Sequence, residues 1–225
     1  MTHTILIDDA LALDDERMTE LASEFPATLK RVGEAHLRLD ARFVLARGDV
    51  ERLSAIGSGK ARYRISFYVS FLPPARGRFA HAHLVLGLDA HSDIDILSIR
   101  PVEQSGAVEI ETEETSGGET SIKYKGIGSK TTHDVKKVYK TVPITIRGIG
   151  PGSDAAEWTL DGPPEEGGLP ATVDLGIDVA LSGPRLVADV RMTAGVRWEG
   201  ILGILPFAWP KGSLGRIVVI DLPAT

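Results

Sequence analysis

The chain has 225 residues, of which 43% are hydrophobic and 25% charged, so a soluble globular protein with a sizeable core is expected. Its net charge of -6 at pH 7 argues against a nucleic-acid-binding surface spread over the molecule, because phosphate contacts need clustered Lys and Arg. It contains no cysteine, which excludes disulfides, thiolate metal ligands and cysteine nucleophiles.

Residues 1–18 lack the basic start and the continuous apolar segment of a secretory signal. No window reaches the about 20 apolar residues that a membrane-spanning helix needs. We therefore expect a cytoplasmic protein without a transmembrane segment.

The N-terminal part of the chain carries mixed patterns. Residues 4–7 favour a short strand, and Asp14 or Asp15 is placed to cap a helix whose first turn is acidic. From residue 37 to residue 45, every second position is apolar, which predicts a strand. A short helix over 49–56 is expected to follow.

The longest alternation occupies residues 62–71 and resumes over 79–88, after a turn that contains two prolines. Apolar residues at every second position predict strands with one buried face. Pairing the two runs as a hairpin with Phe67 opposite Leu84 matches apolar residues with apolar ones. In this register the histidines of the second run lie on the face that points away from the core.

A second hairpin is predicted over residues 108–126, with a three-residue Ser-Gly-Gly loop. Such a loop places Glu111 opposite Lys123 and Glu109 opposite Lys125. Opposite charges then meet across the two strands, which favours this register over one shifted by a residue.

The C-terminal part of the chain predicts further strands. Residues 173–181 and 186–192 alternate on either side of Gly183-Pro184, a dipeptide that suits a type II′ hairpin turn. Pro143 lacks an amide donor and indicates an edge strand. The last run, 216–222, is apolar at consecutive positions and predicts a strand buried on both faces.

The predicted elements together define the fold class. About ten short strands, separated by Gly and Pro and without long helices between them, favour a mainly β protein. We expect an antiparallel β-sandwich, with a barrel as the second choice. Residues 61–225 are assigned to this β-sandwich domain, and residues 1–60 to a short α/β N-terminal segment packed on it.

His81 and His83 lie on the same side of a predicted strand, at a spacing that can chelate one metal ion. His91 and Asp93 follow shortly after, and Asp93 or Asp95 is the candidate third ligand or base. However, the chain continues with Val-Leu-Gly-Leu, where β-barrel metalloenzymes usually place an acidic residue. The usual G-x-S-x-G and H-E-x-x-H motifs are also absent. We therefore expect no cofactor and keep a divalent metal ion as the alternative.

Residues 201–210 form an uncharged segment that Gly and Pro interrupt and that lacks sustained alternation. An apolar loop of this kind either covers the open end of the sandwich or presents a contact surface to a partner or to a membrane surface, where Trp is favoured. The candidate binding residues in and beside this segment are Ile204, Leu205, Phe207, Trp209 and Lys211.

The hairpin at 107–126 has the two-faced character of segments that some pore-forming proteins insert as barrel strands. Its apolar face is short of the about 9 to 11 residues per strand that a bilayer needs. This apolar face consists of Val108, Ile110, Thr112, Ile122 and Tyr124. A solvated edge hairpin is the competing interpretation.

The sequence has strong strand patterns but lacks the usual catalytic motifs. This combination predicts a non-enzymatic interaction or assembly module. We expect it to bind a protein partner, or a second copy of itself, through loop surfaces that include 201–210, and not to bind nucleic acid. Peripheral membrane contact stays open. The alternatives are a metal-dependent enzyme that uses His81 and His83, and a membrane-active or pore-forming β protein that uses the 107–126 hairpin.

Overall fold

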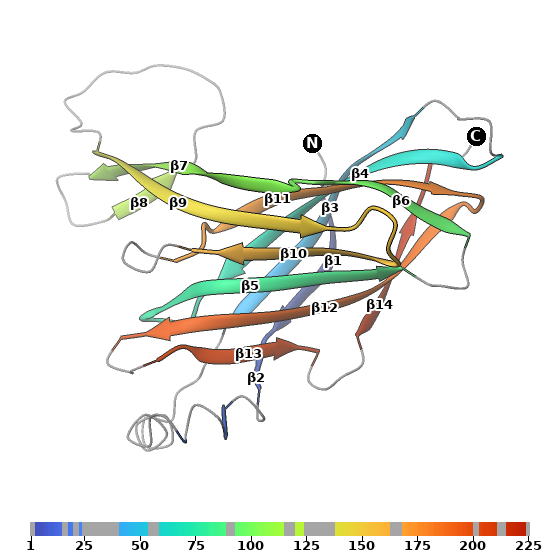
Figure 1. Cartoon of the computed structure of the whole chain (residues 1–225). Coiled ribbons are helices and arrows are strands. Elements are labelled where there is room, and N and C mark those ends of the chain that lie inside the picture. Colours follow the sequence, from blue (N-terminus) through green and yellow to red (C-terminus); the bar gives the residue numbers. More distant parts are fainter. Residues whose placement is uncertain are drawn as a thin grey trace.

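A computed structural model describes residues 3–14, 18–19, 23, 41–53, 59–88, 93–114, 120–123, 138–162, 168–199, 203–210 and 215–223. Within these ranges it describes only the backbone of 105–114, 120–123 and 138–144. The chain folds as an antiparallel β-sandwich of two sheets, which confirms the first-choice fold class (Figure 1). Over the described residues neither sheet closes into a barrel.

The smaller sheet has five strands in the order β1-β3-β4-β11-β6. All neighbouring strands in it are antiparallel. Its strands are β1 (Thr4–Ala10), β3 (Arg42–Leu53), β4 (Ala61–Leu72), β11 (Thr172–Leu181) and β6 (Ile94–Arg100).

The larger sheet has nine strands, eight of them in the order β2-β13-β12-β5-β10-β9-β7-β8, while β14 pairs with β12. Its first members are β2 (Ala12–Leu13), β13 (Leu205–Trp209), β12 (Arg185–Trp198) and β5 (Gly77–Leu88). The remaining members are β10 (Ala155–Asp161), β9 (Val138–Ile149), β7 (Glu103–Glu114), β8 (Thr120–Lys123) and β14 (Arg216–Asp221).

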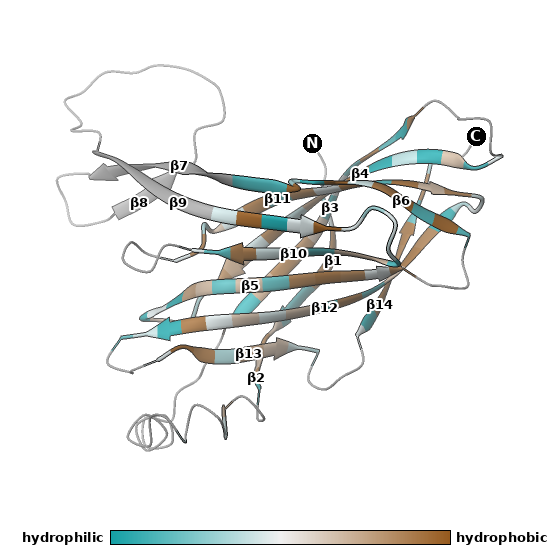
Figure 2. Cartoon of the chain, viewed as in Figure 1, coloured by the Kyte–Doolittle hydropathy of each residue, from teal (hydrophilic) through white to brown (hydrophobic). Residues whose placement is uncertain are grey.

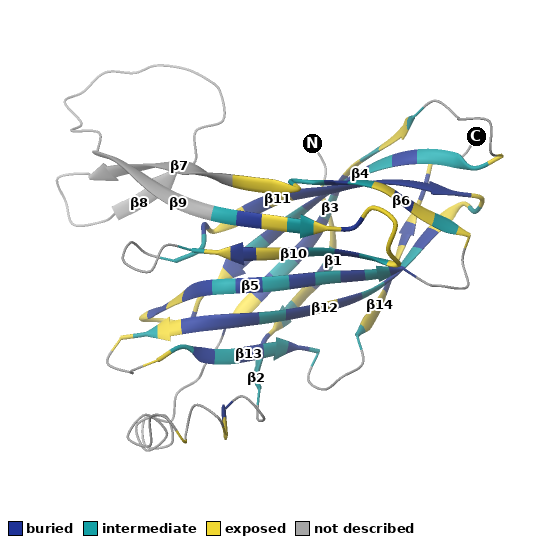
Figure 3. Ribbon diagram, in the orientation of Figure 1, coloured by how far each residue is buried: buried dark blue, intermediate teal, exposed yellow. Residues whose placement is uncertain are grey.

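The core lies between the facing sides of the two sheets. Alternation along the strands is visible as alternating hydrophobic and hydrophilic bands, and the same strands alternate between buried and more exposed residues (Figures 2 and 3). Burial of apolar side chains contributes roughly 25 cal/mol per Å² of apolar area removed from water. The largest fully buried side chains come from both sheets and include Trp158, Phe43, Phe67, Phe71 and Phe207.

Two predicted hairpins are wrong, because their strands belong to different sheets. β4 pairs with β3 and β11, whereas β5 pairs with β10 and β12, so Phe67 and Leu84 are not cross-strand neighbours. β11 and β12, which flank Gly183-Pro184, are likewise in opposite sheets. In both cases the turn carries the chain across the core, and apolar residues of the two runs face one another through the core.

The predicted register of the charged hairpin is confirmed where the structure describes it. β7 and β8 pair with Glu111 opposite Lys123. The second expected pair, Glu109 with Lys125, lies outside the described residues because the description of β8 ends at Lys123. The choice of a three-residue loop with complementary charges therefore gave the correct alignment.

The N-terminal region supplies strands to the smaller sheet. The strand expected at 4–7 is confirmed as part of β1, and the amide of Met18 donates to the carbonyl of Asp14 at 2.8 Å, as in a first helical turn. Beyond that turn, most of the helix expected there lies outside the described residues. The helix expected from residue 49 is wrong over its described part, because β3 continues to Leu53 with a bulge between Arg47 and Val50.

The strand β14 is not buried on both faces, contrary to the prediction. Val218 and Ile220 are buried, whereas Ile217 and Val219 are exposed. The four central residues of β14 are all apolar, but only one face of the strand packs against the core.

Pro143 lies in β9 opposite Ala107 of β7, beyond the part of β9 that pairs with β10. This part of the strand thus has a described partner on one side only, as the edge-strand prediction requires.

Candidate functional site

The histidine pair lies on the outer face of the larger sheet. His81 and His83 are half-buried on β5, alternating with the buried Ala82 and Leu84, so the predicted direction away from the core is confirmed. The Nε2 atom of His83 is 3.2 Å from a carboxylate oxygen of Glu157 on β10. The two imidazoles therefore occupy a polar, partly solvated surface.

The described acidic candidates, Asp93 and Asp95, are not brought to this surface. Asp93 belongs to an ion-pair group beside the smaller sheet, where Lys60 Nζ is 2.6 Å from Asp93 and 2.7 Å from Asp95. The hydroxyl of Ser182 donates to Asp93 at 3.2 Å. His91 lies outside the described residues. Within the described part of the chain, no group of three His, Cys, Asp or Glu side chains could hold a metal ion.

Half of the segment 201–210 is a strand of the larger sheet. Residues 205–209 form β13, in which Leu205, Phe207 and Trp209 are 0%, 1% and 5% exposed. Ile204 is half-buried. Lys211 lies outside the described residues. This placement favours the interpretation of the segment as a cover for the core, because three of the five candidate contact side chains point inward.

Trp209 connects the two sheets at one side of the sandwich. Its indole Nε1 donates to the Asp9 carboxylate of β1 at 3.0 Å, and its ring packs edge-on against Phe43 of β3 with centroids 5.1 Å apart. Arg216 of β14 lies 5.9 Å from the ring centroid and 3.4 Å from Asp9. The hydrogen bond from Trp209 is the main reason why the pKa of Asp9 is lowered.

A second polar cluster crosses three strands on the outer face of the smaller sheet. Asp178 of β11 is 6% exposed and accepts hydrogen bonds of 3.0 Å from Nε and from a terminal nitrogen of Arg64 on β4. Arg100 of β6 approaches the same carboxylate at 3.4 Å. The Arg64 hydrogen bonds are the main cause that holds the pKa of Asp178 below its usual range. The cluster leaves the carboxylate fully paired and has the chemistry of a structural ion pair.

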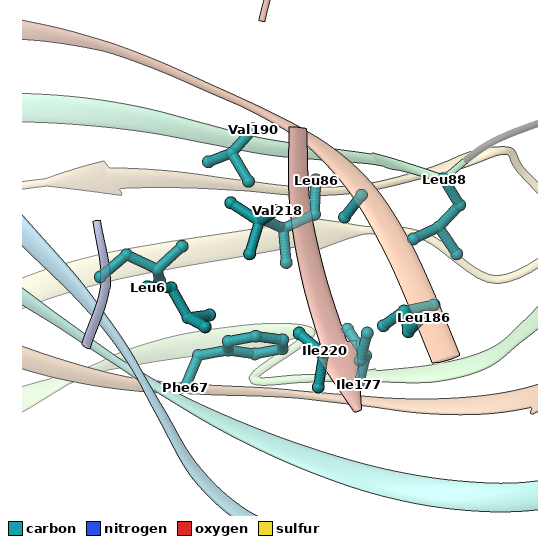
Figure 4. Close-up of a pocket in the computed structure, with 11 residues that line it drawn as sticks. Leu6, Phe67, Leu86, Leu88, Ile177, Leu186, Val190, Val218 and Ile220 are labelled. Carbon is teal, nitrogen blue, oxygen red and sulfur yellow. The ribbon is translucent and has the colours of Figure 1, made fainter. Parts of the chain in front are cut away.

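An apolar pocket between the sheets has no room for a water molecule. Phe67 and Ile177 of the smaller sheet point into it toward Leu86, Val190 and Val218 of the larger sheet (Figure 4). We therefore describe it as packed core and not as a ligand site.

Three strands, β8, β7 and β9, form one end of the larger sheet, and we call them the terminal arm (Figure 1). β7 pairs with β9 from Glu103 opposite Arg147 to Thr112 opposite Val138. Near the core, Ile146 of β9 is buried and Arg147 is exposed, so the even-numbered positions of this part of the strand face inward. Over the rest of the two strands the sequence places mainly apolar residues on the parity of Ile146 and mainly polar residues on the other.

Sequence patterns missed the two polar clusters because each joins strands that are distant in the chain. The sequence contained one signal for the cluster around Asp178. The neighbouring outward positions on β11 are the small residues Gly176 and Ala180. Small residues are favoured where long side chains from adjacent strands lie across the surface. Gly176 leaves room for the guanidinium of Arg100, which would lie 3.0 Å from a Cβ at that position. Nothing in the sequence signals the contact between Asp9 and Trp209.

Among the described residues no helix has the length and apolar character needed to cross a membrane. No protein-family model matches the sequence, and no curated protein matches it. Among solved structures, the chain is similar to Clostridium perfringens delta-toxin, with 9% identity and a TM-score of 0.42 over 81% of this chain and 85% of that one. It is also similar to the Clostridium perfringens NetB toxin in the membrane-inserted form, with 8% identity and a TM-score of 0.34 over 83% of this chain and 92% of that one. Likeness at this level assigns neither a family nor an activity to the chain.

Proposed function

We propose that this protein acts on lipid membranes by inserting the amphipathic terminal arm, which is the membrane-active alternative of the sequence analysis. The observation that carries this proposal is the long pairing of β7 with β9. Each strand has 12 residues, and their register runs from Glu103 opposite Arg147 to Thr112 opposite Val138. A strand that crosses a bilayer needs about 9 to 11 residues. The arm is thus long enough, whereas the 107–126 hairpin considered alone falls short.

The polarity of the arm supports the same proposal. In the β7–β9 register Val108 is opposite Val142 and Gly106 is opposite Ile144, while Glu109 is opposite Thr141. Positions of one parity are therefore mainly apolar and those of the other parity mainly polar. A barrel strand in a membrane requires this arrangement, with one side toward lipid and the other toward water. The exceptions on the apolar parity are Gln104, opposite Ile146, Lys140, opposite Ile110, and Thr112, opposite Val138.

The test is dye release from vesicles of phosphatidylcholine, with and without phosphatidylserine. We expect release by the native chain, stronger from the neutral vesicles because the net charge of -6 opposes anionic lipid. Val142→Asp should abolish release, since a charge on the lipid side is unfavourable in the bilayer. Thr141→Asp adds the same charge to the other parity of the same strand and should preserve release.

A second measurement keeps the test decisive if Val142→Asp fails to fold. Because the chain lacks cysteine, single cysteines at positions 108, 109, 110 and 111 can each carry an environment-sensitive fluorophore. Insertion predicts an emission shift on vesicle addition at 108 and 110 and none at 109 and 111. Intact vesicles together with unchanged emission at all four positions would exclude the proposal.

Binding of a protein partner or of a second copy is the second candidate function. It is favoured by exposed apolar side chains on β14, an edge strand, and not by β13, whose large apolar side chains are buried. The metal-dependent alternative is not favoured, because His83 contacts Glu157 while Asp93 pairs with Lys60 beside the other sheet. The cytoplasmic location expected from the N-terminus stays a prediction.

A further inference from the structure

The strand β14 pairs with β12 on one side and, among the described strands, with none on the other. Its outward-facing residues Ile217 and Val219 are 69% and 49% exposed. An edge strand presents unpaired backbone donors and acceptors that another strand can satisfy. β14 combines such an edge with an apolar surface next to it.

Both edges of the smaller sheet carry features that discourage strand addition. β1 has a bulge between Ile5 and Ile7 and two acidic residues near its end, Asp8 and Asp9. β6 also pairs irregularly with β11 and contains Asp95. Bulges and charged residues are common means of protecting an edge strand. β14 has no bulge, since its register with β12 is regular, and it is charged only at its two ends, with four apolar residues between Arg216 and Asp221.

We propose that two copies of this chain associate through β14, as an antiparallel strand pair around a two-fold axis perpendicular to the larger sheet. In such a pair directly opposite residues lie on the same face. With the axis beside Val218, Ile217 meets the partner's Val219, and the reciprocal contact forms at the same time. The exposed apolar row of each copy thereby lies beside an identical row, as a self-complementary interface requires.

The charges at the two ends of β14 favour a second copy over an unrelated strand. Arg216 begins the strand and Asp221 ends it. Within the chain these residues pair with Asp9 and Arg185, but their side chains stay 60% and 77% exposed. An antiparallel arrangement brings the basic end of one copy toward the acidic end of the other, at both ends of the pair. This inference is independent of the membrane activity proposed above, since it concerns β14 and not the terminal arm.

The register can be tested by cross-linking in solution without lipid. Ile217→Cys and Val219→Cys are prepared separately and then mixed under mild oxidation. Opposite residues of an antiparallel pair have Cβ atoms about 4.5 to 5.5 Å apart, close to the separation that a disulfide bridges. We expect a covalent dimer in the mixture and little in either variant alone. Absence of the dimer in the mixture would contradict this register.

Association itself is tested by mass in solution. The native chain should have about twice the monomer mass of 24.1 kDa. Ile217→Lys with Val219→Lys should return it to the monomer mass, and folding is retained because both side chains are exposed. Ile149→Lys is the control, since Ile149 is also 69% exposed but lies on β9, between β10 and β7, and it should leave the dimer intact. A monomeric native chain at all accessible concentrations would overturn the inference.

Discussion

The indole of Trp209 on β13 donates a 3.0 Å hydrogen bond to the carboxylate of Asp9 on β1. The residue that the sequence placed on a candidate contact surface is thus fixed between the two sheets. Its buried ring needs the carboxylate, because an indole N–H removed from water without an acceptor is unfavourable.

Removal of the acceptor at Asp9 is expected to destabilise the sandwich. Asp9→Ala leaves the indole N–H of Trp209 without its partner, which costs about 1 to 3 kcal/mol. The measurement is the free energy of unfolding in urea. Asp8→Ala is the control, since Asp8 pairs with Arg42 at 2.6 Å on a half-exposed surface and its loss should cost at most about 1 kcal/mol. Equal losses in the two variants would contradict the proposed connection.

Stability should fall in acid because the pKa of Asp178 is lowered in the folded protein. A carboxyl group with a lowered pKa stabilises the fold fully above its ordinary pKa of about 3.9. That contribution is lost as the pH falls below this value and through the lowered one. We therefore expect the free energy of unfolding to decline below about pH 4.

The variant Asp178→Asn isolates this contribution. It removes the charge that Arg64 and Arg100 approach, and should destabilise the protein at pH 7 by about 1 to 3 kcal/mol. It should also flatten the decline in acid. Asp174→Asn is the matched control, because Asp174 lies exposed on the same strand. If the acid decline of Asp178→Asn equals that of the native chain, this carboxylate is not its source.

Two glycines with the same backbone conformation should differ in their tolerance of alanine. Gly152 and Gly168 have φ angles of +79° and +88°, in the left-handed region that an L side chain rarely adopts. A Cβ at Gly152 meets nothing within 4 Å, whereas one at Gly168 collides with the backbone carbonyl of Phe79. Gly152→Ala should cost about 1 to 2 kcal/mol, and Gly168→Ala clearly more. Thermal melting of both variants would show whether this order holds.

A cross-strand disulfide distinguishes the observed sheet order from the hairpin that the sequence favoured. The side-chain oxygens of Ser70 on β4 and Thr172 on β11 are 3.0 Å apart. Ser70→Cys with Thr172→Cys should therefore oxidise readily in this otherwise cysteine-free chain. The hairpin register would instead place Ser70 opposite His81, so Ser70→Cys with His81→Cys is the comparison. Efficient oxidation of the second pair and not of the first would contradict the structure.

The alternation of apolar and polar residues predicted which strand faces are buried, but not which strands pair with one another. The alternation around Phe67 and Ile177 correctly identified two buried faces, because water excludes every second side chain whatever the partner strand. A short turn, however, can close a hairpin or carry the chain to the opposite sheet. The residues before and after the turn have the same pattern in both cases, so pairing remained undetermined for β4 with β5 and for β11 with β12.

Charge was the information that did determine a pairing. Glu111 opposite Lys123 is one of the few cross-strand contacts that the sequence distinguished from its shifted alternatives, and it is confirmed. The candidate sites were less predictable, since burial of Phe207 and Trp209 depends on strands far away in the chain. An uncharged segment indicates that side chains avoid water, and both a core and an interface satisfy that condition.

The order of strands has a further consequence for how the molecule assembles. Neither sheet is a continuous stretch of chain, since β4, β6 and β11 all join the smaller sheet while β5, β7 and β12 join the larger one. Ser70 and its neighbour Thr172 are 102 residues apart in the chain. A native topology dominated by such distant partners folds slowly, because the chain loses the entropy of closing long loops before the stabilising contacts form. We expect a single cooperative transition, and expect that a fragment of either half of the chain cannot complete a sheet.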